Sequence, residues 1–365
     1  MTGFTRFFIL KVEDISRYTG GLKIEDAIKN PPPQVTILSP EEGDAFSNRT
    51  VTLRVQIKDI GGGIGDIRIY HNGKLVESKG VYRLAKSEMI DKQIKVAKAE
   101  IGSPYQSAKR GFELRKIVWD DNDKKDFQIV NFTPLKGTVE KTYKITLING
   151  ENTISASAFN GTNTVMSAME SIKVKADIPE RRPELFAIIM GNDHFKSSTV
   201  NLSFAIKDAE DFSNLINEVA APIYKKVNIK ILTNTKKTAI IKTLTAMKTK
   251  MKPEDVFIFF AATHGWTYDD IYYLYTSDFD GNLLSKQSSI SSVEIMEFSK
   301  WLPALKQVFI LDTCQAGGVK TAVSGLYDAR ISVLAKRSVC TYSQVQKPFR
   351  TQMITMKVTV YLPIS

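Results

Sequence analysis

The chain has 365 residues, 43% of them hydrophobic and 24% charged, a composition that can bury sizeable cores and excludes a disordered or fibrous protein. It has no run of about 18 consecutive apolar residues and only two cysteines, Cys314 and Cys340, so we expect a cytoplasmic protein without membrane spans or a disulfide framework. The net charge of +11 includes nine lysines between residues 225 and 252. No nucleic-acid motif accompanies them, so we favour a solvated outer face over a polyanion contact and expect no nucleic-acid or membrane partner.

The first half of the chain has the pattern of short antiparallel strands. Residues 1–33 form an N-terminal segment and linker that ends in three prolines, and the strand pattern then runs over residues 34–176. Turn signals between the runs and the lack of paired cysteines predict an all-β, immunoglobulin-like sandwich, which an insertion interrupts at residues 82–136. The strands are expected at residues 35–38, 51–57, 67–70, 143–147, 153–159 and 171–174.

The pattern changes after a proline-containing linker at residues 177–184. From residue 185, continuous apolar runs alternate with helical patterns, which predicts a doubly wound, mostly parallel sheet flanked by helices. Strands are expected at residues 185–190, 227–232, 256–262 and 308–311, a hairpin at 271–275, and helices at 204–219, 238–247 and 292–302. In such sheets, catalytic groups gather at the carboxyl ends of the strands.

Two of these strands end in reactive side chains. The run VFIFFAA leads into His264 and Gly265, and VFILD leads into Cys314, which is followed by Gly317 and Gly318. An imidazole within reach of a thiol can take its proton and return it to a leaving amine, and the N–H groups of Gly265 and Cys314 could hold an oxyanion. Each residue alone is also typical of a buried structural role, but the pair at neighbouring strand ends favours a catalytic site.

The second half also resembles a known family through its motifs. In order they are LFAIIMGNDHF, NLSFAIKDAEDF, VFIFFAATHGW and LPALKQVFILDTCQAGG. Residues 182–337 resemble the caspase-like cysteine peptidases (clan CD, peptidase C14), in particular the bacterial, metacaspase-like members, and His264 precedes Cys314 by the 50 residues typical of caspases. The resemblance implies an α/β peptidase domain over residues 185–337, a cysteine-type endopeptidase with a Cys314–His264 dyad, and no metal or organic cofactor.

The resemblance also implies a substrate preference. Asp208 and Asp312 match the positions that form an acidic S1 pocket in metacaspase-like members, so hydrolysis is expected after Arg or Lys. For Asp208, a solvated acid that complements the helix dipole is the alternative. The partners implied are protein or peptide substrates, together with a protein partner for the immunoglobulin-like part.

Other features depart from the family. The segment after Cys314 is Gln315-Ala316-Gly317 instead of His-Ser-Gly, and residues 338–365 form a divergent tail. We therefore expect the caspase-like part to be incomplete at its C-terminal end, which leaves a catalytically inactive scaffold or interaction protein as the alternative function. Calcium is not supported by a clear motif, and we expect solvated acids at Asp269, Asp270, Asp278 and Asp280.

Overall fold

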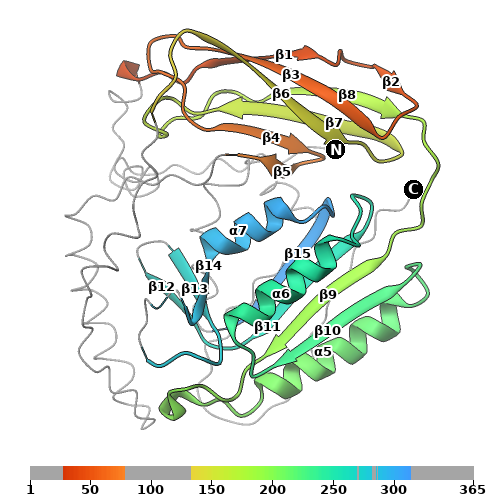
Figure 1. Ribbon diagram of the computed structural model, residues 1–365, viewed down its shortest axis with the longest axis vertical. Helices are drawn as coiled ribbons and strands as arrows, with labels where there is room; N and C mark the ends of the chain where they lie inside the picture. Colours follow the sequence, from red (N-terminus) through yellow and green to blue (C-terminus); the bar gives the residue numbers. More distant parts are fainter. Residues whose placement is uncertain (1–27, 79–132, 269–270, 282–284, 286, 314–365) are drawn as a thin grey trace, which may run out of the picture. The chain divides into compact units, whose positions relative to one another are not determined.

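The computed structural model describes residues 28–78, 133–268, 271–281, 285 and 287–313 (Figure 1). These residues fall into two compact units. The first unit takes the described residues up to Tyr70, residues 77–78 and residues 133–177, and the second takes His71–Val76 and the described residues from Ile178 onward. Nearly all of the expected insertion lies outside the described residues. Cys314, Cys340 and the tail at residues 338–365 also lie outside them.

The described residues before Ile178 form two sheets, and all of their strand residues except His71 and residues 74–76 belong to the first unit. One has the order β1-β3-β6, with both pairs antiparallel, and the other has the order β2-β8-β7-β4-β5. Figure 1 shows them as two layers. The strands are β1 (Gln34–Ser39), β2 (Ala45–Phe46), β3 (Thr50–Lys58), β4 (Ile67–His71), β5 (Lys74–Glu77), β6 (Thr138–Thr146), β7 (Gly150–Ala158) and β8 (Glu170–Ala176).

The alternation of apolar and polar residues along these strands explains why they form a sandwich. In β3, Val51, Leu53, Val55 and Ile57 are all buried while most residues between them are exposed, so one face of the strand covers the core. The six predicted strands are confirmed. β2 and β5 were not predicted, because segments of two and four residues are too short to display a period.

The second unit is built on a parallel sheet with the order β10-β9-β11-β15. Its strands are β9 (Leu185–Gly191), β10 (Val227–Thr233), β11 (Val256–Ala262) and β15 (Lys306–Asp312). All four agree with the predicted apolar runs. Every residue of β9 is buried, as expected for a central strand covered on both faces.

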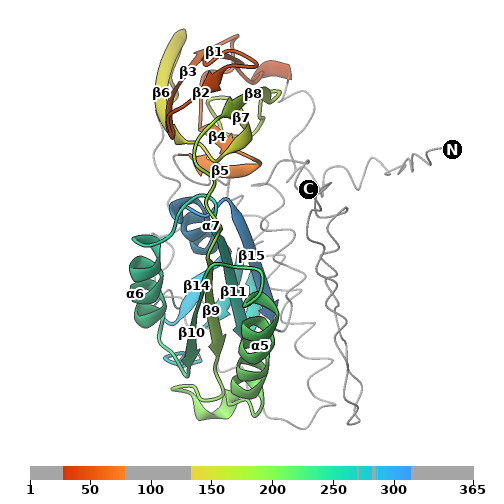
Figure 2. The same ribbon diagram turned by 90° about the vertical axis from the view of Figure 1, so that its right-hand side faces the viewer.

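Helices cover both faces of this sheet. Figure 2 shows α5 (Ala205–Ala220) on one side and α6 (Lys237–Lys248) on the other. The side chains of β9 divide accordingly: Ile188 belongs to the core cluster that contains α6 residues, and Ile189 to the cluster that contains α5 residues. The doubly wound arrangement predicted from the sequence is therefore confirmed.

Helix α5 packs only part of its apolar residues against the sheet. Ala205 and Ala209 are buried, and the Phe212 ring stacks on that of Phe260 with 4.3 Å between centroids. In contrast, Phe204 is 70% exposed, and Leu215 and Val219 are each 44% exposed. Small residues fit at the buried positions because the helix lies very close to the end of β9: a Cβ on Gly191 would come within 2.7 Å of the Ile206 Cα.

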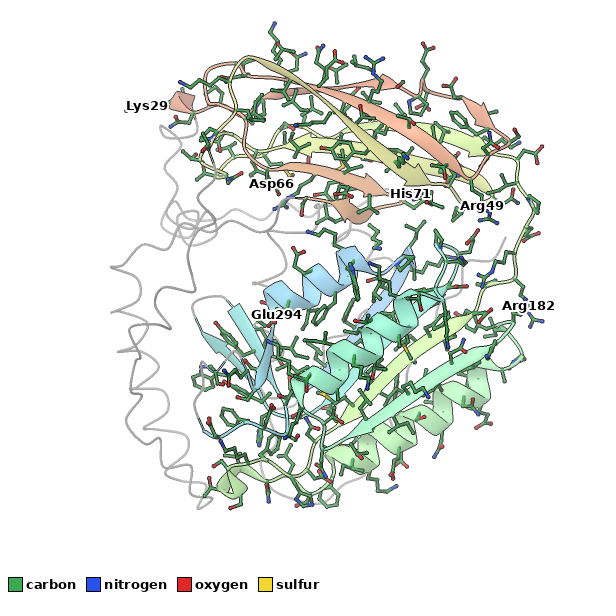
Figure 3. The ribbon with its side chains drawn as sticks, in the orientation of Figure 1. Lys29, Arg49, Asp66, His71, Arg182 and Glu294 are labelled. Atoms are coloured by element: carbon green, nitrogen blue, oxygen red, sulfur yellow. The ribbon has the colours of Figure 1, made fainter. Side chains whose placement is uncertain are left out.

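The described part of the second unit also contains a small antiparallel sheet and a further helix. β12 (Gly265–Tyr268), β13 (Ile271–Tyr275) and β14 (Ser289–Ser291) pair in that order, so the predicted hairpin strand is the centre of a sheet. Helix α7 (Ser292–Trp301) begins with a capping box between Ser291 and Glu294. Glu294, labelled in Figure 3, also pairs with Lys237 at the start of α6 at 2.6 Å.

The central position of β9 predicts a large effect of truncating its core side chains. Ile188 is 0% exposed, so Ile188→Ala should lower the free energy of unfolding of this unit by about 2–5 kcal/mol through lost burial and a residual cavity. Ile231→Ala is the matched control on edge strand β10, where the side chain is 44% exposed and the expected cost is about 1 kcal/mol or less. Urea unfolding followed by tryptophan fluorescence measures the free energy of unfolding of both variants. Equal losses in Ile188→Ala and Ile231→Ala would contradict the assignment of Ile188 to the core.

Candidate functional site

The carboxyl ends of three neighbouring strands meet at one edge of the parallel sheet. Ala262, the last residue of β11, is in register with Gly191 of β9 and with Asp312 of β15. The Thr263 N–H donates to the Asp312 carbonyl at 3.3 Å. The segment that continues to His264 and the one that continues through Thr313 to Cys314 therefore leave the sheet side by side, although Cys314 itself lies outside the described residues.

The His264 side chain is half-buried and held by the loop that follows β9. Its Nε2 lies 2.7 Å from the Val200 carbonyl oxygen, and its ring lies 5.2 Å from the ring of Phe195, measured between centroids. A carbonyl only accepts hydrogen bonds, so the neutral ring carries its proton on Nε2 and presents the lone pair on Nδ1. The ring is thus oriented to accept a proton at Nδ1.

Burial sets the protonation of this histidine. The desolvated site lowers the pKa of His264 below its ordinary value of 6.5, and the hydrogen bond to the Val200 carbonyl opposes the effect. The imidazole consequently stays neutral to a lower pH than a solvated histidine would. A neutral ring is the form that can act as a base.

Gly265 has no room for a side chain. A Cβ there would come within 2.7 Å of the Tyr272 Cζ, closer still to the Tyr272 hydroxyl, and within 2.9 Å of the Thr313 Oγ1. The main chain of β13 also fixes its neighbour, because the Tyr275 N–H donates to the His264 carbonyl at 3.0 Å. This bond makes Gly265–Leu274 a non-hydrogen-bonded pair, so the Gly265 N–H points away from the ladder with β13.

The close contact at Gly265 predicts that even one methyl group is harmful. Gly265→Ala should lower the free energy of unfolding by roughly 1–3 kcal/mol, because the buried Tyr272 cannot move aside without disturbing the core. Gly265→Ala combined with Tyr272→Phe should recover part of the loss, since the nearest clashing atom is removed. Thermal unfolding measures both variants, and a Gly265→Ala protein as stable as the wild type would contradict the contact.

Two of the predicted site acids interact electrostatically. Asp208 is in the first turn of α5, and although its side chain reaches solvent, partial burial and then the negative charge of Asp312 raise its pKa above the ordinary value. Asp211 and Asp193 repel it further. Asp208, in the first turn of α5, is therefore near enough to Asp312, at the end of β15, for the two negative charges to interact.

Three residues around this site were not identified from the sequence. Val200 and Phe195 hold His264 from a loop more than 60 positions earlier in the chain. Asp193 is buried, and its Oδ1 accepts a hydrogen bond from the Ala205 N–H at 2.8 Å, which satisfies the first turn of α5. An acid two residues after the end of β9 was the available signal for Asp193, but the helix whose first turn it satisfies begins 12 residues later.

Comparison with protein families finds one match in each half of the chain. A caspase domain model of the peptidase C14 family matches residues 184–356, and a bacterial Ig domain model matches residues 33–88. The chain contains a caspase domain preceded by a bacterial Ig domain. The caspase match extends past residue 337, where we expected the resemblance to end, so it does not confirm that the domain is incomplete.

Solved structures and curated proteins add little to this. The fibronectin(III)-like modules of Clostridium thermocellum CbhA match at 13% identity and a TM-score of 0.22, over 40% of this chain and 47% of theirs, so the chain spans about half of that structure. Protein GSU0716 from Geobacter sulfurreducens matches at 12% identity and a TM-score of 0.29, over 42% of this chain and 66% of that one. The CARDB domain of the PF1109 protein from Pyrococcus furiosus matches at 15% identity and a TM-score of 0.21, over 40% of this chain and 90% of that one. The comparison with curated proteins found no match.

The acids after His264 in the caspase domain have protein partners. Asp278 accepts a hydrogen bond from the Thr276 hydroxyl at 2.5 Å, and Asp280 lies 3.8 Å from the Lys196 amine. Asp269 and Asp270 lie outside the described residues. Within the described ranges, no group of three or more His, Cys, Asp or Glu side chains is arranged to hold a metal ion.

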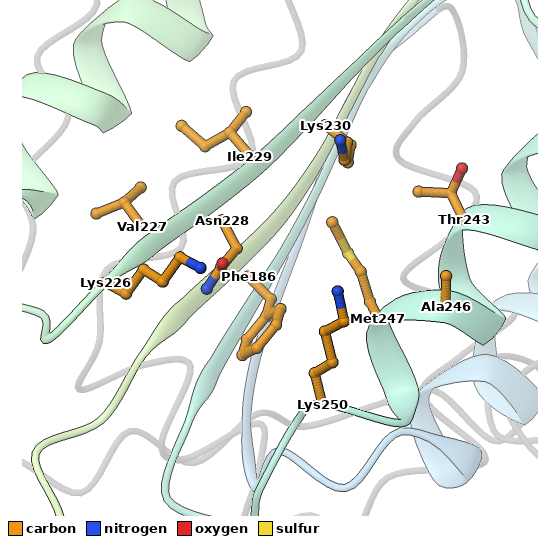
Figure 4. Close-up of a pocket in the computed structure, with 10 residues that line it drawn as sticks. All are labelled: Phe186, Lys226, Val227, Asn228, Ile229, Lys230, Thr243, Ala246, Met247 and Lys250. Carbon is orange, nitrogen blue, oxygen red and sulfur yellow. The ribbon is translucent and has the colours of Figure 1, made fainter.

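A separate hollow of about 340 Å³ lies at the other end of the parallel sheet (Figure 4). Phe186 and Val227, near the amino ends of β9 and β10, contribute to its wall, so it is remote from the strand ends that lead to His264. Lys226, Lys230 and Lys250 also line it and are exposed. This placement agrees with the expected solvated face of the lysine run.

In the part of the chain that the structure describes, no helix is both long enough and apolar enough to cross a lipid bilayer.

Proposed function

We propose that the caspase domain is a cysteine endopeptidase in which Cys314 and His264 hydrolyse the peptide bond after Arg or Lys. The observation that carries the proposal is the pair of adjacent, in-register strand ends: β11 leads to His264, and β15 leads through Thr313 toward Cys314. The peptidase C14 match supports a protein substrate. The orientation of His264 supports its role as the base.

The chemistry would proceed through an acyl-enzyme. The Nδ1 of His264 takes the proton of the Cys314 thiol, and the thiolate attacks the carbonyl carbon of the substrate. The Gly265 N–H, which points away from β13, and the Cys314 N–H stabilise the resulting oxyanion. When the C–N bond breaks, imidazolium returns the proton to the leaving amine, and water then hydrolyses the thioester to release the acid and the free thiol.

The acidic pair would select the residue before the cleaved bond. An ammonium or guanidinium group between the carboxylates of Asp208 and Asp312 would gain charge-assisted hydrogen bonds. It would also relieve the repulsion from Asp312, which adds to the effect of partial burial in raising the pKa of Asp208. An acidic side chain would meet repulsion at the same place. The proposal therefore includes a preference for Arg and Lys over Asp.

Matched fluorogenic peptides that differ only in a P1 residue of Arg, Lys, Ala or Asp test the proposal on the full chain, with Cys314→Ala in parallel. We expect cleavage of the Arg and Lys peptides that is lost in Cys314→Ala. Cleavage that survives this substitution would contradict the mechanism, and a preference for Asp would contradict the acidic pocket. A folded protein that cleaves none of the peptides would favour an inactive scaffold.

A further inference from the structure

The Tyr272 hydroxyl lies between the two chain segments that carry the proposed dyad. Tyr272 is on β13 and is 0% exposed, with its ring in the core cluster shared by β9, β11 and α6. Its hydroxyl is hydrogen-bonded to the Thr313 Oγ1. Thr313 follows β15 and directly precedes Cys314, so the bond links the antiparallel sheet to the end of the parallel sheet.

The hydroxyl groups of Tyr272 and Thr313 also lie close to Gly265, the residue after His264. The Cα of Gly265 lies so close that a Cβ would come within 2.7 Å of the Tyr272 Cζ and 2.9 Å of the Thr313 Oγ1. Gly265 is the residue after His264, and Thr313 is the residue before Cys314. The contact between Tyr272 and Thr313 therefore involves the residue before Cys314 and lies against the residue after His264.

The hydrogen bond fixes geometry in a way that the ring alone would not. A phenyl ring of the same shape would fill this part of the core equally well, whereas a buried hydroxyl carries a desolvation cost that its partner has to offset. The bond restrains Thr313, which is otherwise at the end of its strand. A nucleophile displaced by about 1 Å can lose on the order of 100-fold in rate, so restraint at this point has a direct effect on catalysis.

We propose that Tyr272 is a positioning residue, which acts through Thr313 to set the place of Cys314 relative to His264. The inference rests on the proposed function, because it assigns a role toward the same dyad. Tyr272 takes no part in proton transfer or in substrate binding. Its removal should slow the chemical step and leave substrate affinity nearly unchanged.

A double-mutant cycle on the full chain tests this role. Tyr272→Phe and Thr313→Val should each lower kcat for the preferred peptide by about 10- to 100-fold with KM changed less than about two-fold, and the double variant should lose no more than either single variant, because one bond is removed in all three. Thr313→Ser keeps a hydroxyl at that position and should recover most of the rate. Losses that multiply in the double variant, or an unchanged kcat in Tyr272→Phe, would overturn the proposal.

A second measurement separates this inference from the proposed function. In a Cys340→Ser background, the rate of Cys314 alkylation by iodoacetamide is followed against pH in the wild type, Tyr272→Phe and the control Tyr224→Phe, whose half-buried ring lies beyond the end of α5. The wild type and the control should share one profile, and Tyr272→Phe should shift the profile, because the ionisation of a thiol depends on where it lies relative to the imidazole. Coincident profiles for all three would overturn the role of Tyr272. A shifted profile in a protein that cleaves no peptide would retain that role and contradict the peptidase.

Discussion

His264→Ala is expected to lower kcat for cleavage after Arg by about 10²- to 10⁴-fold, because the substitution removes the group that takes the thiol proton and returns it to the leaving amine. Steady-state kinetics with the preferred fluorogenic peptide measures the loss. His194→Ala is the matched control, since His194 is exposed in the same domain and only its backbone N–H is seen to bond, to Asn234. Equal activity in His264→Ala and the control would contradict the role of His264.

The same histidine sets the direction of the pH dependence. Burial lowers the pKa of His264 below 6.5, so the ring remains a neutral base as the pH falls through the range where a solvated histidine would be protonated. The acidic limb of the plot of kcat/KM against pH is therefore expected below pH 6.5. A limb above this value would contradict the buried, neutral imidazole.

Removing the paired carboxylates is expected to abolish most of the preference for basic P1 residues. Asp208→Asn and Asp312→Asn should each lower kcat/KM for the Arg peptide by about 10- to 100-fold, the value of a hydrogen bond to a charged group, with little effect on the Ala peptide. Because the pKa of Asp208 is raised, its carboxylate becomes neutral at a higher pH than an ordinary aspartate. The preference for Arg over Ala should accordingly weaken as the pH falls toward the acidic range.

Asp211→Asn is the control for charge on the same helix. Asp211 lies three residues after Asp208, is exposed, and pairs with Lys207 at 2.8 Å. A general effect of surface charge on a cationic peptide would appear in Asp211→Asn as well. Equal losses in Asp208→Asn and Asp211→Asn would therefore contradict the acidic pocket and leave Asp208 as a solvated acid at the helix start.

The regular core of the caspase domain could be predicted because its strands have strong local signals. The run VFIFFAA is apolar throughout and forms β11, and the residue after such a parallel strand has to emerge at the carboxyl edge. This placed His264 correctly at the end of β11. The extent of β6 was less predictable: it begins at Thr138, five residues before the expected strand, in a charged segment with no apolar run.

What surrounds His264 could not be predicted, because it depends on contacts between distant parts of the chain. Nothing local to Val200 shows that its carbonyl will orient an imidazole 64 positions later. Tyr272 looks like an ordinary strand residue, and its bond to Thr313 follows from how two separate sheets meet. The exposure of Phe204 at the start of α5 has a related cause, since the close approach of the helix to Gly191 leaves room for Ala205 in the interface there.

The most direct test of the central claim is to identify the residue that an Arg-containing peptidyl acyloxymethyl ketone labels in the full chain. Such a reagent reacts with a thiolate placed in a substrate site, and the chain offers two thiols, Cys314 and Cys340. We predict labelling of Cys314 by mass spectrometry, which His264→Ala slows and the matching Asp reagent does not produce. Labelling of Cys340 in its place, or equal labelling of Cys314 with and without His264, would contradict the account.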